Sequence, residues 1–194
     1  MDILRKTEDY VTNLLLNKLD SKYAFHNLRH STQVVEKAST LATSEKIRDK
    51  EQKILLLAAW FHDTGFIYDH RDHEKRSCVI ATEFLSSITA DDDLITDVSK
   101  TILCTRLPQN PVSHIQEILC DADLHHLGSK EYETWSRLLL MELQSLNLKL
   151  DEKEWVHKNI LFFEGHRYFT ASAKELWQTQ KLINLQVLRA AAKR

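Results

Sequence analysis

The chain has 194 residues, a length that favours one domain with a sizeable core. Its 26 basic and 28 acidic side chains give a net charge of −2, which provides no electrostatic reason to expect nucleic acid or an anionic membrane as a partner. The sequence has no apolar run of the ~18 residues that a membrane span needs, and its first five residues do not resemble a signal peptide. We therefore expect a cytoplasmic protein that acts on a small molecule; its oligomeric state stays open, and a homodimer is compatible with the sequence.

Glycine and proline are rare, with 3 and 2 copies. Turns and bulged strands use these residues, so their scarcity predicts an all-α fold of about eight to nine helices. In chain order, apolar residues at helical spacing predict helices over about 2–19, 30–42, 50–63, 72–87, 92–103, 115–127, 130–146, 151–163 and 172–189.

The third predicted helix is apolar on all faces from Ile54 to Phe61, which is typical of a central helix covered by others. We expect Gly65 to end it as a left-handed cap. The acidic run 91–93 suits the N-terminus of the fifth helix, while Asp151 with Glu154 and Ser172 with Glu175 have the spacing of capping boxes. The three scattered cysteines and the four tryptophans are expected in the core, the cysteines as reduced thiols.

Two histidines and two carboxylates occur in the order expected of a metal site: His30, then the pair His62 and Asp63, then Asp123. Each lies in or beside an apolar helical stretch, where an ionisable group is costly unless it is paired or bound to a metal. Imidazole and carboxylate suit zinc, iron or manganese. A core histidine bonded to a neighbouring carboxylate is the simpler alternative for the pair taken alone. Asp121 competes with Asp123, because residues two apart lie on different sides of a helix.

These residues resemble the HD superfamily of metal-dependent phosphohydrolases, in which a His, a His-Asp pair and a later Asp on helices bind the metal. The matching positions are His30, His62, Asp63 and Asp123, and the Ala-Asp-x-Leu form around residue 123 favours that aspartate over Asp121. The segment 25–30, Phe-His-Asn-Leu-Arg-His, resembles the Tyr-His-Asn-x-x-His signature of cyclic nucleotide phosphodiesterases and of a group of small bacterial HD proteins. The resemblance covers about residues 23–128, so we expect one HD-type domain over 1–194 with helices 130–194 packed on this motif core.

The resemblance implies a phosphohydrolase, a phosphodiesterase or a phosphomonoesterase, acting on a phosphoester that is a nucleotide or a cyclic nucleotide. It implies His26 as the general acid, and Asp63 as a ligand that also takes part in catalysis. The expected cofactor is a divalent metal ion (Mn, Fe, Zn or Mg). One ion should be firmly held, a second ion is possible, and His73 and His114 are the candidates for its additional ligands. Arg106, His126 and His166 are weaker predictions for substrate binding.

The sequence departs from the phosphodiesterases after the His-Asp pair, where it continues Thr-Gly-Phe-Ile-Tyr, and it lacks their large nucleotide-binding region. It is closer to the short bacterial group, whose Glu-x-x-Ser element matches Glu74 and Ser77. Two alternatives remain: a non-catalytic HD domain that senses a ligand or docks partners, and a di-iron oxygenase, which would need further histidine ligands.

Overall fold

The computed structural model describes residues 2–148 and 150–193, and every regular element in them is a helix. Nine α-helices and two short 3-10 helices are present in this described part, which confirms the all-α prediction. They are α1 (Ile3–Lys18), α2 (Leu28–Ser44), α3 (Asp49–Phe61), η1 (Thr64–Ile67), α4 (His73–Ile88), α5 (Asp92–Leu103), α6 (His114–Asp123), η2 (His125–Gly128), α7 (Tyr132–Ser145), α8 (Glu152–Gly165) and α9 (Ala171–Ala191).

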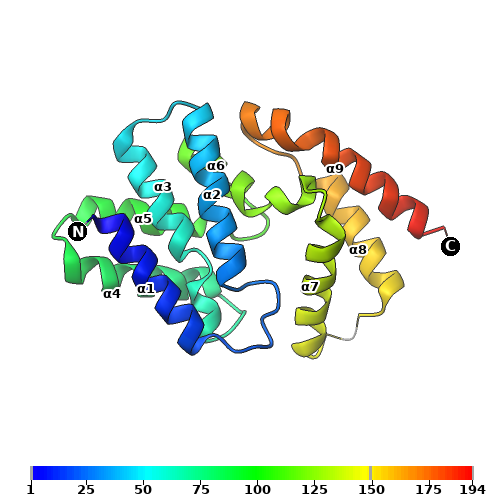
Figure 1. Ribbon diagram of the computed structural model, residues 1–194, viewed down its shortest axis with the longest axis horizontal. Coiled ribbons are helices and arrows are strands. Elements are labelled where there is room, and N and C mark those ends of the chain that lie inside the picture. Colours follow the sequence, from blue (N-terminus) through cyan, green and yellow to red (C-terminus); the bar gives the residue numbers. More distant parts are fainter. Residues whose placement is uncertain (1, 149, 194) are drawn as a thin grey trace.

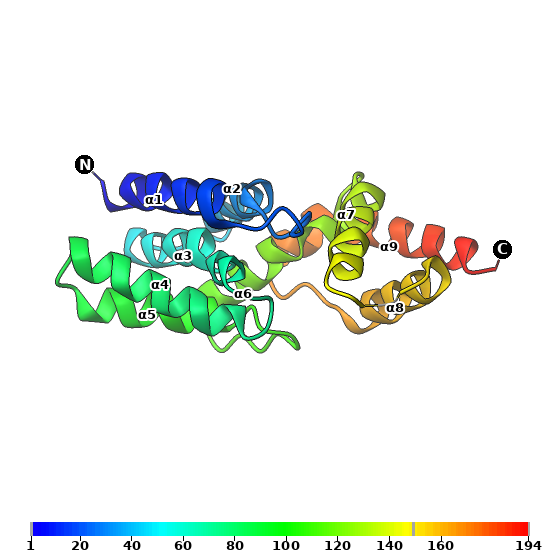
Figure 2. The same cartoon turned by 90° about the horizontal axis from the view of Figure 1, so that it is seen from below.

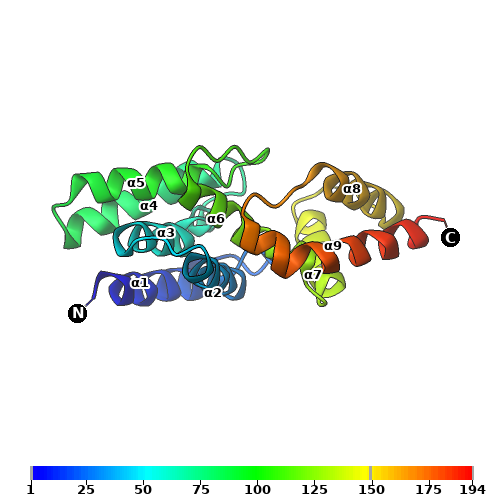
Figure 3. The same ribbon diagram turned by 90° about the horizontal axis from the view of Figure 1, so that it is seen from above.

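The helices form two groups along the long axis of the molecule (Figure 1). Helices α1 to α6 make one group and α7 to α9 the other, with η2 between them; the views from below and above show the same division (Figures 2 and 3). Helix α3 packs against α1, α2, α4, α5 and α6, and its side chains from Leu57 to Ala59 and Phe61 are completely buried. The prediction of a central, all-round apolar third helix is therefore confirmed.

The second group is attached through η2, which packs against α7 and α9. Leu124, Leu127, Tyr132, Phe163 and Leu185 form a separate small core there. Gly128 is needed at this junction, because a Cβ atom at this position would lie 2.5 Å from the Cβ of Trp177 on α9.

Several helix ends differ from the predictions. Gly65 is not a left-handed cap, since no glycine of the described chain has a positive φ; it is required instead because its Cα approaches α4 so closely that a Cβ would lie 2.0 Å from the carbonyl oxygen of His73. The predicted helix 115–127 ends at Asp123 and continues as the 3-10 helix η2. The Ser172 capping box is wrong, because Thr170 caps α9 by accepting the amide of Ala173.

Other local predictions hold. Asp91 accepts the Leu94 amide at the start of α5, and Asp151 and Glu154 form the capping box of α8. Cys104 and Cys120 are buried free thiols, whereas Cys78 is only partly buried. Among the described residues, none of the helices is both long enough and apolar enough to cross a membrane.

Candidate metal centre

The structure brings His30, His62, Asp63 and Asp123 together at the ends of three helices. His30 lies in the first turn of α2, His62 is the C-cap of α3, and Asp123 is the last residue of α6. The Nε2 atoms of the two histidines are 3.4 Å apart. Asp63 Oδ2 lies 3.3 Å from Nε2 of His30 and 3.2 Å from Nε2 of His62, and Asp123 Oδ1 lies 3.2 and 3.6 Å from the same two nitrogens.

The protonation pattern of His62 shows why this cluster needs a cation. Its Nδ1 lies 2.8 Å from the carbonyl oxygen of Ala59, so Nδ1 carries the proton and donates it. In the neutral ring Nε2 is then a lone pair that faces the carboxylate oxygens and the ring of His30. Asp63 Oδ2 is buried and has no hydrogen-bond donor in the described structure. Buried acceptors that converge in this way are unfavourable unless a positive charge lies between them, either a proton on an imidazole or a metal cation.

The charges agree with this geometry. Burial by itself would lower the pKa of His62, but Asp63 and Asp123 outweigh it and hold the pKa well above its usual value. Burial would raise the pKa of Asp63, but the two histidines hold it well below the usual range. The cluster thus favours bound positive charge, and the C-termini of α3 and α6 add to that preference. Two imidazole nitrogens and two carboxylates fit a divalent transition metal.

His26 lies beside this cluster but is not on the helix that carries His30. Asn27 is the N-cap of α2, so His26 precedes the helix and its ring reaches the site from the loop, with its centroid 5.7 Å from that of His30. Its partner is Glu142 on α7: Nδ1 of His26 lies 2.5 Å from Oε1, and the backbone amides of His26 and Phe25 donate to Oε2 at 3.0 and 2.9 Å. Burial alone would raise the pKa of Glu142, but its hydrogen bonds with His26 and Phe25 hold the pKa below its usual range.

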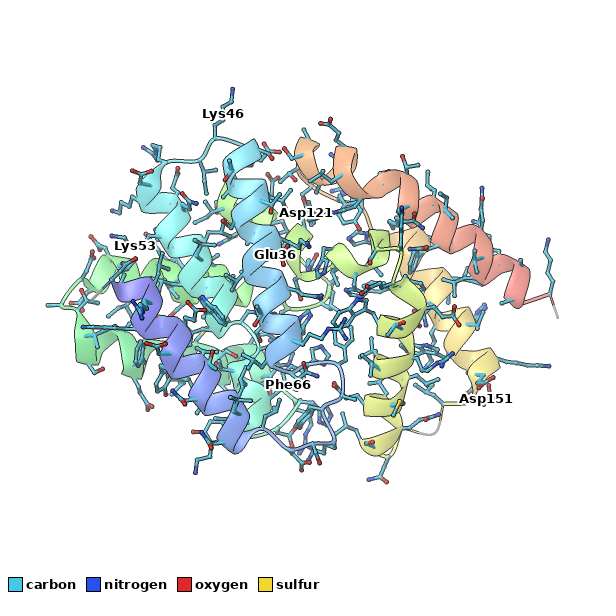
Figure 4. All side chains as sticks on the ribbon, viewed as in Figure 1. Glu36, Lys46, Lys53, Phe66, Asp121 and Asp151 are labelled. Carbon is cyan, nitrogen blue, oxygen red and sulfur yellow. The ribbon has the colours of Figure 1, made fainter. Side chains whose placement is uncertain are left out.

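The other side of the site is formed by η1 and the start of α4. The ring of Phe66 stacks on His26 with 4.3 Å between centroids and contacts His73 at 4.2 Å; Figure 4 shows Phe66 near the N-terminal end of α2. His73 Nδ1 donates to the carbonyl of His70, which leaves Nε2 facing Asp63 Oδ1 at 3.5 Å and Glu74 Oε1 at 3.7 Å. His73 and Glu74 are therefore available to a second cation beside the first.

A cavity of about 490 Å³ opens from the cluster toward α7 and α8. His26, Asp63, Asp123 and the predicted substrate-binding residues Arg106 and His126 line it. Arg106 lies 3.5 Å from Asp72 in an ion pair. His126 is 7% exposed and its Nδ1 has no hydrogen-bond partner in the described structure; burial lowers its pKa to about 3, so the ring is neutral.

Three other predicted candidates lie outside this cavity lining. His166 is packed between Phe162 and Tyr168, away from the metal-binding cluster. His114 lies at the surface and pairs with Glu45 and Glu117. Asp121 is completely buried on the side of α6 near the start of α9 (Figure 4), where it accepts the amides of Phe169 and Thr170 at 2.8 Å.

The sequence analysis did not identify Glu142 as a site residue. Glu142 stands among leucines on the predicted helix 130–146, at ten residues from Tyr132 and seven from Trp135, which is the spacing of the buried face. A single carboxylate on an inward helical face is the signal that could have identified it. Ser77 on α4 is completely buried, and its hydroxyl oxygen accepts a hydrogen bond from the backbone amide of Gly65. This bond attaches the turn after Asp63 to α4.

Comparison with known proteins agrees with this arrangement. Residues 27–128 match the HD domain family. The chain is also similar to the crystal structure of a predicted HD superfamily hydrolase from an uncultured Thermotogales bacterium, with 21% sequence identity and a TM-score of 0.64 over 97% of this chain and 91% of the other. At that identity the likeness establishes the fold. No curated protein matches the chain.

Proposed function

The chain belongs to the HD-domain family, and we propose that it is a metal-dependent phosphohydrolase that cleaves a small phosphoester, a nucleotide or cyclic nucleotide by class. The observation that carries the proposal is the convergence of two imidazole nitrogens and two carboxylates on one buried point, with Asp63 Oδ2 left without a donor. A structural core histidine would be expected to have its acceptors matched by donors.

His30, His62, Asp63 and Asp123 would hold the metal. A divalent ion bound there supplies an activated water and polarises a phosphoryl oxygen. Asp63 would also serve a second ion together with His73 and Glu74, because its other oxygen faces His73 at 3.5 Å.

The role that we assign to His26 is to protonate the oxygen of the leaving alcohol. The Nδ1–H group of His26 donates a hydrogen bond to Glu142 Oε1, which fixes the ring orientation and turns Nε2 away from the carboxylate. General acids of this kind typically contribute 10²–10⁴-fold in rate. Arg106, with 57% of its side chain exposed at the rim of the cavity, can bind phosphate oxygens.

The experiment is to purify the protein, measure bound metal by mass spectrometry, and assay p-nitrophenyl phosphate and bis(p-nitrophenyl) phosphate with Mn²⁺, Fe²⁺, Zn²⁺ or Mg²⁺. We expect stoichiometric metal and metal-dependent turnover of at least one ester. His114→Ala is the control, because this surface histidine lies outside the site. Bound metal without turnover of either ester would refute hydrolysis and favour a sensor role; the absence of bound metal would refute the site itself.

A further inference from the structure

The cavity beside the metal-binding cluster has a second wall of a different chemical character. Helix α8 contributes Trp155, Lys158, Asn159 and Phe162, which are spaced i, i+3, i+4 and i+7 and so share one helical face. Helix α7 contributes Leu139 and Leu143, one turn apart. Figures 1 and 2 show both helices in the group that faces the metal-binding half of the molecule.

This wall adjoins the catalytic end directly. Leu143 follows Glu142, the partner of His26, and Leu139 lies three residues before it, so α7 carries both the support of His26 and part of the wall. A molecule whose phosphoester is at His26 would therefore place its organic part against α7 and α8. The cavity volume, about 490 Å³, lies within the range of small-molecule sites.

The apolar side chains of the wall are incompletely covered by the protein. Leu139, Leu143, Trp155 and Phe162 are all only partly buried, in contrast to the core residue Phe163 at 2% exposure. The sequence prediction that all tryptophans are core residues is thus wrong for Trp155. Four adjoining half-exposed apolar side chains that line a cavity are typical of a ligand surface.

The polar groups of the same wall are largely occupied within the protein. The indole N–H of Trp155 donates to Ser136 Oγ at 2.9 Å. The side-chain oxygen of Asn159 accepts the hydroxyl of Tyr132, and its amide donates to the carbonyl of Trp155 at 2.7 Å. These groups hold the wall in place and leave mainly an apolar surface toward the cavity, with the exposed Lys158 beside it.

We infer that this wall binds the organic part of the substrate, and that the substrate class is a phosphoester of an aromatic alcohol or a nucleoside whose planar ring is held by shape and not by hydrogen bonds. The inference rests on the proposed function, which places the phosphoryl group at the metal end. His126, whose buried Nδ1 has no hydrogen-bond partner in the described structure, is one of the polar residues of the same lining. A surface of this kind accepts different aromatic rings with similar affinity.

The test compares phenylphosphonate with methylphosphonate, two ligands with a stable C–P bond that differ only in the aromatic ring. Binding to the Mn²⁺-loaded full chain is measured by calorimetry, and turnover of p-nitrophenyl phosphate is measured separately. Burial of the ring predicts about tenfold or more tighter binding of phenylphosphonate. Phe162→Ala should bring the two affinities within about threefold, whereas Leu161→Ala on the same helix, whose side chain is 55% exposed, should leave the preference unchanged.

Leu139→Trp provides a second variant should Phe162→Ala fail to fold, because a larger side chain fills the cavity without removing core packing. It should weaken phenylphosphonate and leave methylphosphonate unchanged. Adenosine and uridine monophosphates should bind within about tenfold of each other. Equal affinities for the two phosphonates, no binding of either, or a preference beyond about a hundredfold for one base would overturn the inference. Turnover without ring preference would leave the proposed function intact, and ring preference without turnover would refute only that function.

Discussion

Replacing Glu142 by glutamine tests whether Glu142 positions His26 for catalysis or only stabilises the fold. Glu142 is 1% exposed, lies on α7, and accepts hydrogen bonds from three donors of the loop before α2. The glutamine is of similar size but neutral, and its amide group places hydrogens where one of the two accepting oxygens was. The protonated form of His26 therefore loses its counter-charge, and its ring loses the acceptor that fixes Nδ1.

The expected magnitudes follow from these contacts. One charge-assisted hydrogen bond is lost and two are weakened, which should lower the free energy of unfolding by about 2–3 kcal/mol. Turnover of an ester with a poor alkyl leaving group, which needs the acid, should fall about 10²-fold, the lower end of the usual contribution of a general acid. An ester with a p-nitrophenolate leaving group needs little protonation and should lose less than about tenfold.

The assay measures kcat and KM for both esters, metal content by mass spectrometry, and stability by urea unfolding. Glu133→Gln on the same helix is the matched control, since its side chain is 88% exposed and its ion pair with Arg137 is at the surface. An equal loss on both esters, with metal content unchanged, would show that Glu142 supports the fold alone and would refute the acid role of His26.

Three further outcomes follow from the structure. Asp63→Ala should abolish stoichiometric metal binding, measured by mass spectrometry, and leave the helical circular dichroism intact, because the side chain is a ligand at a helix end. Asp121→Asn should retain metal but lower the free energy of unfolding in urea by about 2–3 kcal/mol, since an amide cannot accept all the donors at the start of α9. His166 is partly buried beside Tyr168 and the Lys181 ammonium, and this desolvation, followed by the charge of Lys181, lowers its pKa to about 3. In the unfolded chain the pKa of a histidine is about 6.5, so as the pH falls the unfolded state binds the proton before the folded state does. The contribution of His166 to the free energy of unfolding is therefore complete above about pH 6.5 and decreases as the pH falls from there to the pKa of the folded state. At about pH 5 the loss is at most about 2 kcal/mol, and His166→Leu should remove it, as seen in urea midpoints at neutral and acidic pH.

The helices were largely predictable because the chain has few residues that interrupt them. Apolar spacing located every α-helix to within a few residues, and the central position of α3 followed from its apolar composition on all faces. The errors lie where tertiary contact overrides local signals. Gly65 was interpreted as a left-handed cap, but close approach of α4 is what excludes a side chain there. Ser172 has capping-box spacing, yet Asp121 accepts the backbone amide of Thr170, and Thr170 rather than Ser172 is the N-cap of α9.

The candidate site was predictable in part for a related reason. His30, His62, Asp63 and Asp123 are conspicuous because ionisable residues interrupt apolar segments, and this needs no knowledge of the partner helix. Helical spacing alone could not decide between Asp121 and Asp123, since both interrupt the same helix; only the resemblance to the HD family favoured Asp123. The structure places them on different sides, with Asp121 on the amides at the start of α9 and Asp123 on the imidazoles of the cluster. Glu142 was missed because its partner is 116 residues away in the sequence.

The residues of the cluster lie at helix ends, and the partner of His26 comes from a helix of the other group. His30 stands in the first turn of α2, while His62 and Asp123 stand at the C-terminal ends of α3 and α6, whose dipoles favour a cation. Glu142 lies in the last turn of α7 and is 1% exposed, so packing rather than a central place in the helix holds it where it orients His26. The family match ends at residue 128, but both the partner of His26 and the apolar cavity wall lie beyond it. The segment 27–128 carries the residues that we propose as metal ligands, while α7 and α8 carry the partner of the proposed acid His26 and the wall of the proposed substrate pocket.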